Sequence, residues 1–409
     1  MKNGDVLSPG AVADPYALFA LLRENEPVFW DERYRSWFLS RYAENEAALR
    51  DPRLSSDRIT PVIERERRRA QPDAGLIQTL EQLDGWMVFR DPPEHTRLRR
   101  LVHKAFSPKM VRAMREQVVT VTDELLDAAQ EQAVADGTVD LLQAVAFPLP
   151  AIVIAGMLGV PPEDRDLFKQ WSDDISALVF GGMEDPARHE RARTGMSMLV
   201  GYVGELVERA RHDPRDDLAT ALVQAHDEDG ALSESEVVAT CVNVLFGGHE
   251  TTTNLIANAV LALLLHPEQA ELLRQDVGRA PAAVEEFLRY DGPAKAVARV
   301  AAQDFDLLGR RISAGDRVFL LPAAANRDPA VFDRPDELDI TREPNPHLGF
   351  GAGMHYCLGA SLARLEGAIT IPRIFERFPG LRLTGEPLTW KPVLLTRGLS
   401  ALPVHLGAG

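Results

Sequence analysis

Cys357 stands near the end of a glycine-rich segment, His347–Gly359, which reads HLGFGAGMHYCLG. An apolar stretch with helical spacing follows over Leu358–Phe378, so Cys357 is expected at a helix N-terminus. Free N–H groups and the positive end of the helix dipole favour the thiolate over the thiol at such a place. A thiolate can bind a metal or act as a nucleophile. Taken alone, this cysteine fits a reactive or incidental thiol better than a metal ligand.

A second group of interest lies in the middle of a long helical pattern. Ser233 and Glu236 form a capping box, and the pattern runs over Glu234–His266 until Pro267 stops it. From Gly247 the sequence reads GGHETTTN, and each glycine costs about 1 kcal/mol of helix stability. A buried helix weakened at its centre predicts a large non-protein group against it or a local distortion. Close helix–helix packing through the two glycines is an equally good alternative.

These segments occur in an order that resembles the cytochrome P450 family. The haem-binding signature F-x-x-G-x-x-x-C-x-G of that family is matched at Phe350, Gly353, Cys357 and Gly359. The resemblance spans about Asp14 to Leu406, and this signature is its most specific part.

Four further segments resemble the family. Gly247–Thr252 is similar to its oxygen-activation motif, and Glu286 with Arg289 matches its E-x-x-R motif. The segment ANRDP followed by FDRPDEL resembles the approach to the haem loop. Asp91–Val102, DPPEHTRLRRLV, is similar to a propionate-binding segment of soluble bacterial members.

The resemblance implies that haem b (iron protoporphyrin IX) is the cofactor and that Cys357 is the axial ligand of its iron. A thiolate ligand donates electron density that helps O–O cleavage. The cofactor contacts implied near the iron are Gly248, Phe350, Gly351 and Gly359. The two haem propionates need cations if they are buried. The motif positions assign them His95, Arg99, Arg299 and His355, with His347 as a weaker candidate.

The resemblance assigns proton delivery to Glu250 and Thr251. A carboxylate can relay protons from water, and a hydroxyl can hold the oxygen that receives them. Adjacent helix residues point about 100° apart, so a local widening of the helix or an inserted water is expected here. Thr252 is expected to bond back to a helix carbonyl.

A structural ion cluster is implied by the E-x-x-R motif. Glu286 and Arg289 are spaced i, i+3 on a helix, where salt pairs are common. In the family a third arginine joins the pair and braces the haem loop, and Arg334 occupies the matching position. These three residues are expected to be structural rather than catalytic.

The implied substrate pocket is mostly apolar, which favours a hydrophobic organic molecule of moderate size. By resemblance it draws on Trp86, Leu245, Val297, Leu394 and Leu395. Lys295 lies in a segment that neutral residues usually line. We expect it at the surface, the alternative being contact with an anionic group. Substrate identity, the site of oxidation and the oligomeric state stay open.

Electrons are expected from a ferredoxin and its ferredoxin reductase, because no flavin, nicotinamide or iron–sulfur motif is visible. From His95 to Arg115 there are seven Lys and Arg and no Asp or Glu, in a chain of net charge −16. An acidic ferredoxin would be steered to this segment. The alternative is a solvated helix face that also supplies a propionate ligand.

The implied activity is a monooxygenase that inserts one O₂-derived oxygen atom into a hydrophobic organic substrate, in secondary metabolism. An oxidase of the same fold that catalyses oxidative coupling, desaturation or epoxidation is the first alternative. A non-enzymatic haem-binding sensor is a distant one, because it predicts no Glu250–Thr251 pair and an attached output domain.

Strand-like segments near both ends must frame these groups. Pro27–Trp30 and Ser36–Ser40 predict a hairpin, and further strands are expected at Val297–Ala301, Arg317–Leu321 and Ala401–Leu406. Helices are expected over Pro108–Gln130, Ala151–Leu158, Asp164–Val179 and Ala192–Arg211. This segregation predicts a mainly α (α+β) fold. The resemblance implies a helical bundle around the haem with a small β-rich region, as a single domain over residues 1–409.

The composition excludes several classes of protein. Of 409 residues, 45% are hydrophobic and 26% charged, which excludes disordered and fibrous chains. Net negative charge argues against nucleic acid and anionic membrane as partners. No signal peptide is visible, and prolines leave the uncharged run Ala144–Pro162 too short to cross a bilayer. Two cysteines, Cys241 and Cys357, fit a reducing cytoplasm, with Cys241 expected in the core.

Overall fold

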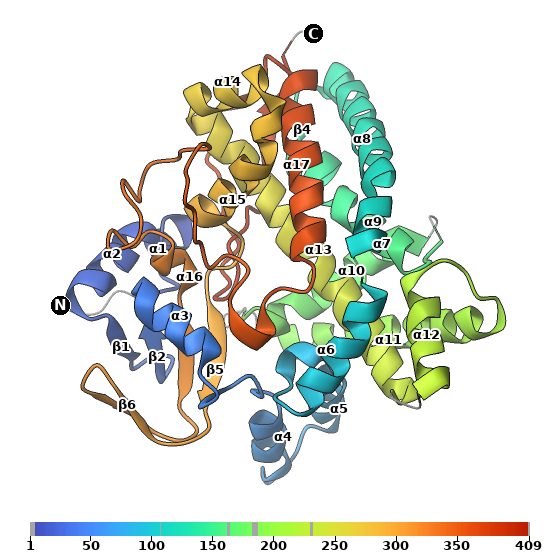
Figure 1. Cartoon of the computed structure of the whole chain (residues 1–409), viewed down its shortest axis with the longest axis vertical. Coiled ribbons are helices and arrows are strands. Elements are labelled where there is room, and N and C mark those ends of the chain that lie inside the picture. The colour runs from blue at the N-terminus through green and yellow to red at the C-terminus, as the bar shows by residue number, and fades with distance from the viewer. Residues whose placement is uncertain (1–4, 107, 162–163, 182–186, 230–231, 408–409) are drawn as a thin grey trace.

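The computed structural model describes residues 5–106, 108–161, 164–181, 187–229 and 232–407. Helices make up most of it, and one group of strands lies to one side of them (Figure 1). The α-helices are α1 (Pro9–Ala13), α2 (Tyr16–Asn25), α3 (Tyr42–Arg50), α4 (Thr60–Arg67), α5 (Ala74–Asp84), α6 (Glu94–Ala105), α7 (Pro108–Ala113), α8 (Arg115–Asp136), α9 (Pro148–Met157), α10 (Arg165–Val179), α11 (Arg188–His212), α12 (Leu218–Asp229), α13 (Glu234–Leu265), α14 (Pro267–Gln275), α15 (Ala280–Asp291), α16 (Pro322–Ala325) and α17 (Ala360–Arg377). Shorter helical turns are η1 (Met87–Phe89), η2 (Leu142–Ala146), η4 (Val277–Arg279) and η5 (Gly353–His355).

The strands are β1 (Val28–Asp31), β2 (Ser36–Leu39), β3 (Leu54–Ser55), β4 (Val139–Asp140), β5 (Val297–Ala301), β6 (Phe305–Leu307), β7 (Arg310–Ile312), β8 (Arg317–Leu320), β9 (Arg382–Leu383) and β10 (Pro403–His405). They form a five-stranded sheet in the order β1-β2-β8-β5-β3, a three-stranded sheet β4-β10-β9 and the hairpin β6-β7. The predicted hairpin near the start is confirmed, with Val28 opposite Leu39. The mainly α fold with a small β-rich region is also confirmed.

The five-stranded sheet joins the two ends of the chain. β2 pairs in parallel with β8, with Trp37 opposite Val318, and β8 pairs antiparallel with β5. In this way Arg299 on β5 is fixed beside strands that come from the first forty residues. This pairing supports our proposal that residues 1–409 form a single domain.

Helix α13 has the predicted capping box at its start. The Ser233 hydroxyl accepts from the Glu236 N–H at 3.2 Å, and the Glu236 carboxylate accepts from the Ser233 N–H at 2.7 Å. The helix ends at Leu265, one residue before the predicted end, with His266 as its cap. Its 32 residues span about 48 Å, and nearly all side chains from Glu250 to Leu263 are buried.

Other helices differ from their predicted bounds at the ends. The predicted helix over Pro108–Gln130 is divided at Met114, and its second part continues to Asp136. There Gly137, with a φ of 78°, ends the helix in the left-handed conformation that glycine adopts without strain. α9 begins earlier than predicted, at Pro148, because prolines are tolerated in the first helical turn.

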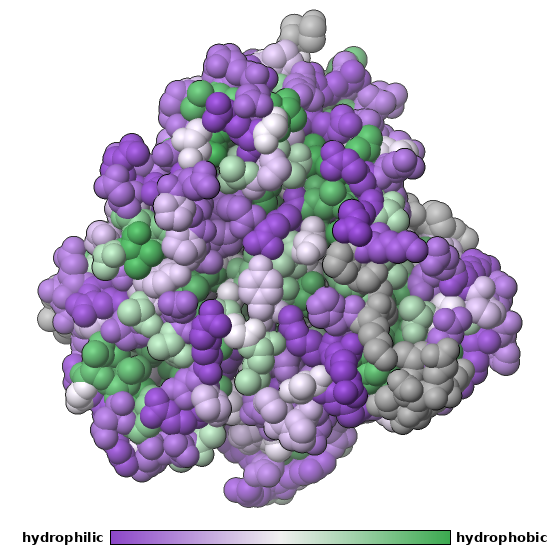
Figure 2. All heavy atoms as spheres, viewed as in Figure 1, coloured by the Kyte–Doolittle hydropathy of each residue, from purple (hydrophilic) through white to green (hydrophobic). Residues whose placement is uncertain are grey.

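The main hydrophobic core lies among the helices, where α17 packs against α13 and α15. Cys241 on α13 is fully buried, as expected. Figure 2 shows a mostly hydrophilic face with hydrophobic residues in small separate groups. Across the described ranges, no helix is long and apolar enough to serve as a membrane span.

Candidate haem site

The loop before Cys357 turns through two glycines in left-handed conformations. Gly351 has a φ of 70° and Gly353 a φ of 69°, and a Cβ at Gly353 would lie 3.1 Å from the Leu49 carbonyl oxygen. The Cys357 N–H donates to the Phe350 carbonyl oxygen at 2.9 Å, which closes the turn. α17 begins at Ala360, two residues after the predicted start, and Cys357 stands just before its N-terminus.

Many protein atoms surround the Cys357 sulfur, although its side chain is exposed. The residue is solvent-accessible. The surrounding protein nevertheless raises the pKa of its thiol through burial, while the N–H groups of Gly359 and Ala360 act in the opposite direction. These N–H groups favour the thiolate, as predicted for a helix N-terminus, but the effect of burial is larger. A Cβ at Gly359 would meet no atom within 4 Å.

All four residues predicted for the propionates come together beside this loop. His95 and His355 have ring centroids 4.1 Å apart, and Arg99 donates to the Tyr356 carbonyl oxygen at 2.6 Å. Arg299 is buried, and burial lowers its pKa to about 10. Burial and the charge of Arg299 lower the pKa of His355 to about 3, so its ring is neutral at pH 7.

These residues fit the propionates of a haem. His95 is only 1% exposed, yet neither of its ring nitrogens has a hydrogen-bond partner within the described ranges. The only hydrogen bond that the Arg299 guanidinium makes among the described residues is to the carbonyl oxygen of its neighbour Ala298. Buried polar groups without hydrogen-bond partners lower the stability of the fold unless a bound anion supplies the missing partners. These side chains are therefore suited to bind buried carboxylates beside a thiol.

Sequence reasoning missed Arg58, which lies next to this cluster. Its guanidinium sits 4.8 Å from the ring centroid of Phe89, and burial together with the charge of Arg299 lowers its pKa to about 10. No ion pair to Arg58 is found in the part of the chain that the structure describes. In the sequence, Arg58 is marked only by its position after Ser55 and Ser56 and before α4.

The two glycines of α13 face different surroundings. A Cβ at Gly248 would lie 2.8 Å from Cγ1 of Ile154 on α9, so Gly248 permits close helix packing. A Cβ at Gly247 would meet nothing within 4 Å. Gly247 is therefore the glycine that borders open space, and the assignment of Gly248 to the cofactor stays a prediction.

Helix α13 is regular through Glu250 and Thr251, and the predicted local widening is absent. The Thr251 hydroxyl donates to the Gly247 carbonyl oxygen at 3.2 Å, and Thr252 donates to Gly248 at 3.3 Å. Thr252 is buried, whereas Thr251 is half-buried and thus reachable.

The Glu250 carboxylate is 5% exposed, and the ammonium of Lys391 lies 3.4 Å from its Oε1. Lys391 was not predicted as part of the site, and its side chain is about one-third exposed. It therefore connects the buried carboxylate with solvent.

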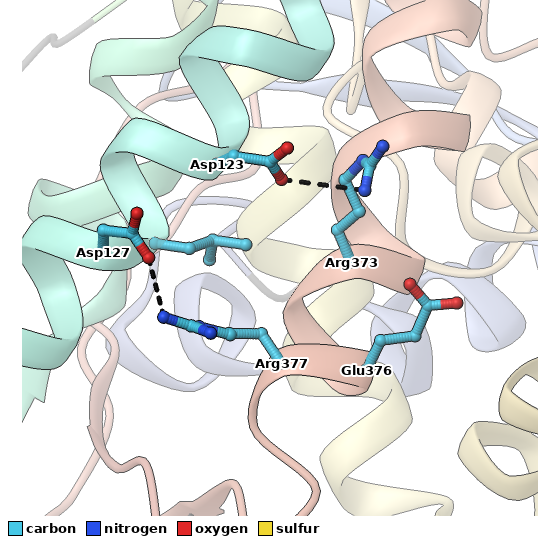
Figure 3. A pocket seen from close by; sticks show the side chains of 6 residues that line it. Asp123, Asp127, Arg373, Glu376 and Arg377 are labelled. Carbon is cyan, nitrogen blue, oxygen red and sulfur yellow. Dashed lines mark hydrogen bonds and ion pairs between the residues drawn. The ribbon is translucent and has the colours of Figure 1, made fainter.

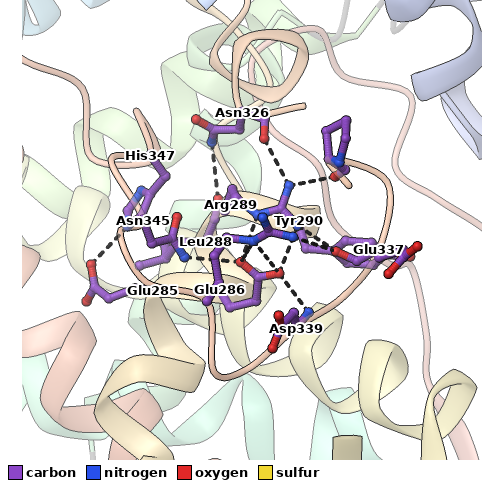
Figure 4. Close-up of polar contacts among 12 residues, drawn as sticks. Glu285, Glu286, Leu288, Arg289, Tyr290, Asn326, Glu337, Asp339, Asn345 and His347 are labelled. Atoms are coloured by element: carbon purple, nitrogen blue, oxygen red, sulfur yellow. Dashed lines mark hydrogen bonds and ion pairs between the residues drawn. The ribbon is translucent and has the colours of Figure 1, made fainter. Parts of the chain in front are cut away.

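A buried ion pair braces the segment that leads to the haem loop (Figure 4). Glu286 and Arg289 on α15 have fully buried side chains and make two hydrogen bonds of 2.7 and 2.8 Å. Arg289 also donates to the carbonyl oxygens of Asn326, Pro335 and Glu337. The Asn326 side chain in turn accepts from the Leu348 N–H at 2.7 Å. The Glu286–Arg289 pair therefore connects α15 to the backbone of the segment that leads to the cysteine loop.

The third arginine is Arg342, so the prediction of Arg334 is wrong. Arg342 Nε lies 3.2 Å from Glu286 Oε2, and its side chain is 8% exposed. Arg334 is an exposed side chain that pairs with Asp333 and Glu337 instead. His347 is also misassigned, because it contacts Glu285 at 2.9 Å rather than the propionate cluster.

We expect Arg342→Gln to destabilise the holoenzyme by about 1–3 kcal/mol, because it removes hydrogen bonds to a buried charge. Arg334→Gln should leave stability unchanged, since its ion pairs are exposed. Urea unfolding of both variants, followed at the haem absorbance, checks this. A loss of stability in Arg334→Gln without one in Arg342→Gln would return the role to Arg334.

The residues predicted for the substrate pocket are divided among three hydrophobic clusters. Trp86 and Leu245 belong to the helical core, Leu394 and Leu395 to the cluster beside β1 and β2, and Val297 to the cluster beneath the haem loop. Phe180 connects two of them, since its carbonyl accepts from the Leu395 N–H and its ring stacks on Phe246 at 5.3 Å. The pocket assignment stays a prediction.

Lys295 does not lie at the surface, contrary to expectation. It is 4% exposed, and its Nζ donates to the Val393 carbonyl oxygen at 2.6 Å.

Two open cavities lie elsewhere. One of about 360 Å³ between α8 and α17 is crossed by the ion pairs Asp123–Arg373 and Asp127–Arg377 (Figure 3). Exposed pairs of this kind contribute little to stability. The other, of about 510 Å³, is lined by residues of α4, α5, α10 and α11, including Val62, Leu76 and Leu178.

Comparisons with known proteins agree on one family. The cytochrome P450 family model matches residues 64–387. The Vitamin D(3) 25-hydroxylase of Pseudonocardia autotrophica is 41% identical over 99% of this chain and 97% of its own length. Cytochrome P450 monooxygenase PikC of Streptomyces venezuelae is 41% identical over 97% of this chain and 92% of its own. The crystal structure of CalO2 superposes with a TM-score of 0.89 at 34% identity, covering 99% of both chains.

Proposed function

Because this chain belongs to the cytochrome P450 family and is a haem-binding monooxygenase, we propose that it inserts one O₂-derived oxygen atom into a hydrophobic organic substrate. The observation that carries the proposal is the exposed Cys357, with His95, Arg99, Arg299 and His355 gathered beside its loop. A thiolate ligand and a set of carboxylate partners are what a haem of this class requires.

Haem, when bound, supplies the iron chemistry that activates O₂. Cys357 would hold the iron, and the N–H groups that contact its sulfur would set its donor strength. Arg99, Arg299 and His95 would bind the propionates and so fix the plane of the cofactor. Arg58, beside Arg299, adds a further cation on that side.

Glu250 and Thr251 would move protons from solvent to the reacting oxygen. The Lys391 ammonium contacts Glu250 Oε1 and reaches solvent, so it can exchange protons with water and orient the carboxylate. Glu250 would then pass a proton toward the Thr251 hydroxyl, through water, because the two side chains point about 100° apart on a regular helix. Thr251 would leave its bond to the Gly247 carbonyl and donate its own hydroxyl proton to the reacting oxygen, while its Oγ1 accepts a replacement proton from that water.

Electrons would come from a ferredoxin and its reductase. Four exposed cations, Arg100, Lys109, Arg112 and Arg115, lie on α6 to α8 and support docking of an acidic partner there. Arg97 is engaged with Glu236, and the Lys104 side chain lies outside the described residues.

The substrate would be a secondary metabolite or a lipophilic molecule. One relative is named for hydroxylation of vitamin D(3), and the predicted pocket of this chain is apolar. Oxidative coupling, desaturation and epoxidation need the same proton delivery and stay alternatives. The cytoplasmic location expected from the cysteine usage stays a prediction.

Thr251→Ala tests the proposal. Without its hydroxyl the oxygen is held less well, so electrons should be diverted to hydrogen peroxide while substrate binding is retained. We expect the ratio of product to NADH consumed to fall about 10-fold or more, a typical loss for a general acid–base group. The assay is reconstituted turnover with a ferredoxin and its reductase, measuring product and peroxide.

Thr252→Ala is the matched control, because Thr252 bonds to a carbonyl in the same way but is buried. It should keep most of the coupling. Full coupling in Thr251→Ala would remove Thr251 from the mechanism.

A further inference from the structure

Lys295 is a buried cation without an anionic partner. The residue is 4% exposed, and in the described part of the chain its ammonium makes a single hydrogen bond, to the Val393 carbonyl oxygen at 2.6 Å. No carboxylate forms an ion pair with it among the residues that the structure describes. An ammonium has three N–H donors, so two remain for another acceptor.

The surroundings of Lys295 destabilise its charged form. Burial and the charge of Arg397 lower the pKa of Lys295 to about 8. The nearby carboxylate of Asp291 is engaged with Arg397 at 2.5 Å and with the Tyr16 hydroxyl. A buried ammonium in such a place is stabilised when a ligand brings an anion.

The backbone around Lys295 has the form of a β-bulge. The N–H groups of Lys295 and Ala296 both donate to the Leu395 carbonyl oxygen, at 3.0 and 3.1 Å. A bulge places two residues opposite one and re-aims a side chain, and bulges are common beside binding sites. This one occurs just before β5, the strand that carries Arg299.

The segment that Lys295 contacts is also the one that approaches the reacting groups. It runs from Lys391, the partner of Glu250, through Val393 to Leu395, whose N–H donates to the Phe180 carbonyl. Phe180 stacks on Phe246, the residue before Gly247 on α13. Lys295 therefore contacts the segment that carries both Lys391, the partner of Glu250, and Leu395 of the predicted pocket.

We propose that Lys295 binds an acidic group of the substrate, so that the enzyme selects hydrophobic molecules that carry a carboxylate. This rests on the proposed function and specifies its substrate class. The carboxylate would accept hydrogen bonds from one or both free N–H groups of the ammonium. The apolar part of the substrate would occupy the predicted pocket. Hydrogen bonds between ions are the stronger ones, so the acid should bind about 10-fold or more tightly than a neutral analogue.

The test uses the purified haem-containing enzyme and chemically matched ligands. Decanoic, dodecanoic and hexadecanoic acids would be titrated against the primary alcohols of the same length. Affinity would be measured by calorimetry and by the haem absorbance of the ferric protein. We expect the wild type to prefer at least one acid over its alcohol by about 10-fold or more.

Lys295→Met should abolish that preference and leave the affinity for alcohols unchanged, while Lys295→Arg should retain part of it. Arg382→Gln, which removes a cation from the exposed side of β9, is the control and should behave as wild type. If Lys295→Met does not fold, the comparison is made with Lys295→Gln. Acids that bind wild type no more tightly than their alcohols, or not at all, overturn the proposal, as does an unchanged preference in Lys295→Met.

The same samples separate the two claims. A thiolate-type carbon monoxide spectrum without any preference for acids would refute the role of Lys295 alone. Absence of that spectrum would refute the proposed function.

Discussion

Replacing Cys357 with histidine will give a protein that still takes up haem and no longer oxygenates its substrate. An imidazole donates less electron density to the iron than a thiolate does, so O–O cleavage loses its main support. The cations beside the loop are unchanged by this substitution, which is why haem should be retained. Product formation in the reconstituted assay should fall to background, with haem content measured on the same samples.

Cys241→Ala is the matched control for this substitution. Cys241 is buried in α13 and burial raises the pKa of its thiol to about 12, so it is a small apolar residue of the core. This variant should keep the spectrum and turnover of the wild type. Undiminished turnover in Cys357→His would refute the axial assignment.

Glu286→Ala should lower the free energy of unfolding by about 3–5 kcal/mol, because it leaves Arg289 and Arg342 buried without their carboxylate. The loss extends to the haem loop, since the same carboxylate accepts from the Asp339 N–H and the Asn345 side chain. Urea unfolding and the rate of haem transfer to an apo-globin acceptor would measure both effects.

Glu337→Ala provides the comparison, since its carboxylate pairs only with the exposed Arg334 among the described residues. It should unfold at the urea concentration of the wild type. A Glu286→Ala variant as stable as this control would show that the cluster does not support the fold.

The sequence determined the parts of the site that local chemistry specifies. Glycine at 351 and 353 permits the left-handed backbone found there, and the capping box of α13 requires only neighbouring residues. The gathering of His95, Arg99, Arg299 and His355 followed from matched motif positions, and the structure brings them together.

What could not be predicted depends on contacts between distant segments. Arg334 and Arg342 stand on the same irregular segment, and only the path of its backbone decides which one reaches Glu286. Gly247 and Gly248 are adjacent, and the position of Ile154 on another helix distinguishes them. Lys295 was expected at the surface because lysine usually is, but a bulge directs it inward.

The environment of Glu366 on α17 could not be predicted from the sequence either. It is 1% exposed with both carboxylate oxygens unpartnered, and burial raises its pKa well above the ordinary value. No local pattern distinguishes it from a solvated helix glutamate. Burial of this kind follows only from the packing of α17 against its neighbours.

The carbon monoxide difference spectrum of the reduced, purified protein tests the central claim most directly. With sulfur from Cys357 on the iron, the complex should show the Soret band of a thiolate-ligated haem, and that band should be lost in Cys357→His. A wild-type protein that is colourless after expression with ample haem, or whose carbon monoxide complex shows an imidazole-type band, would contradict the account.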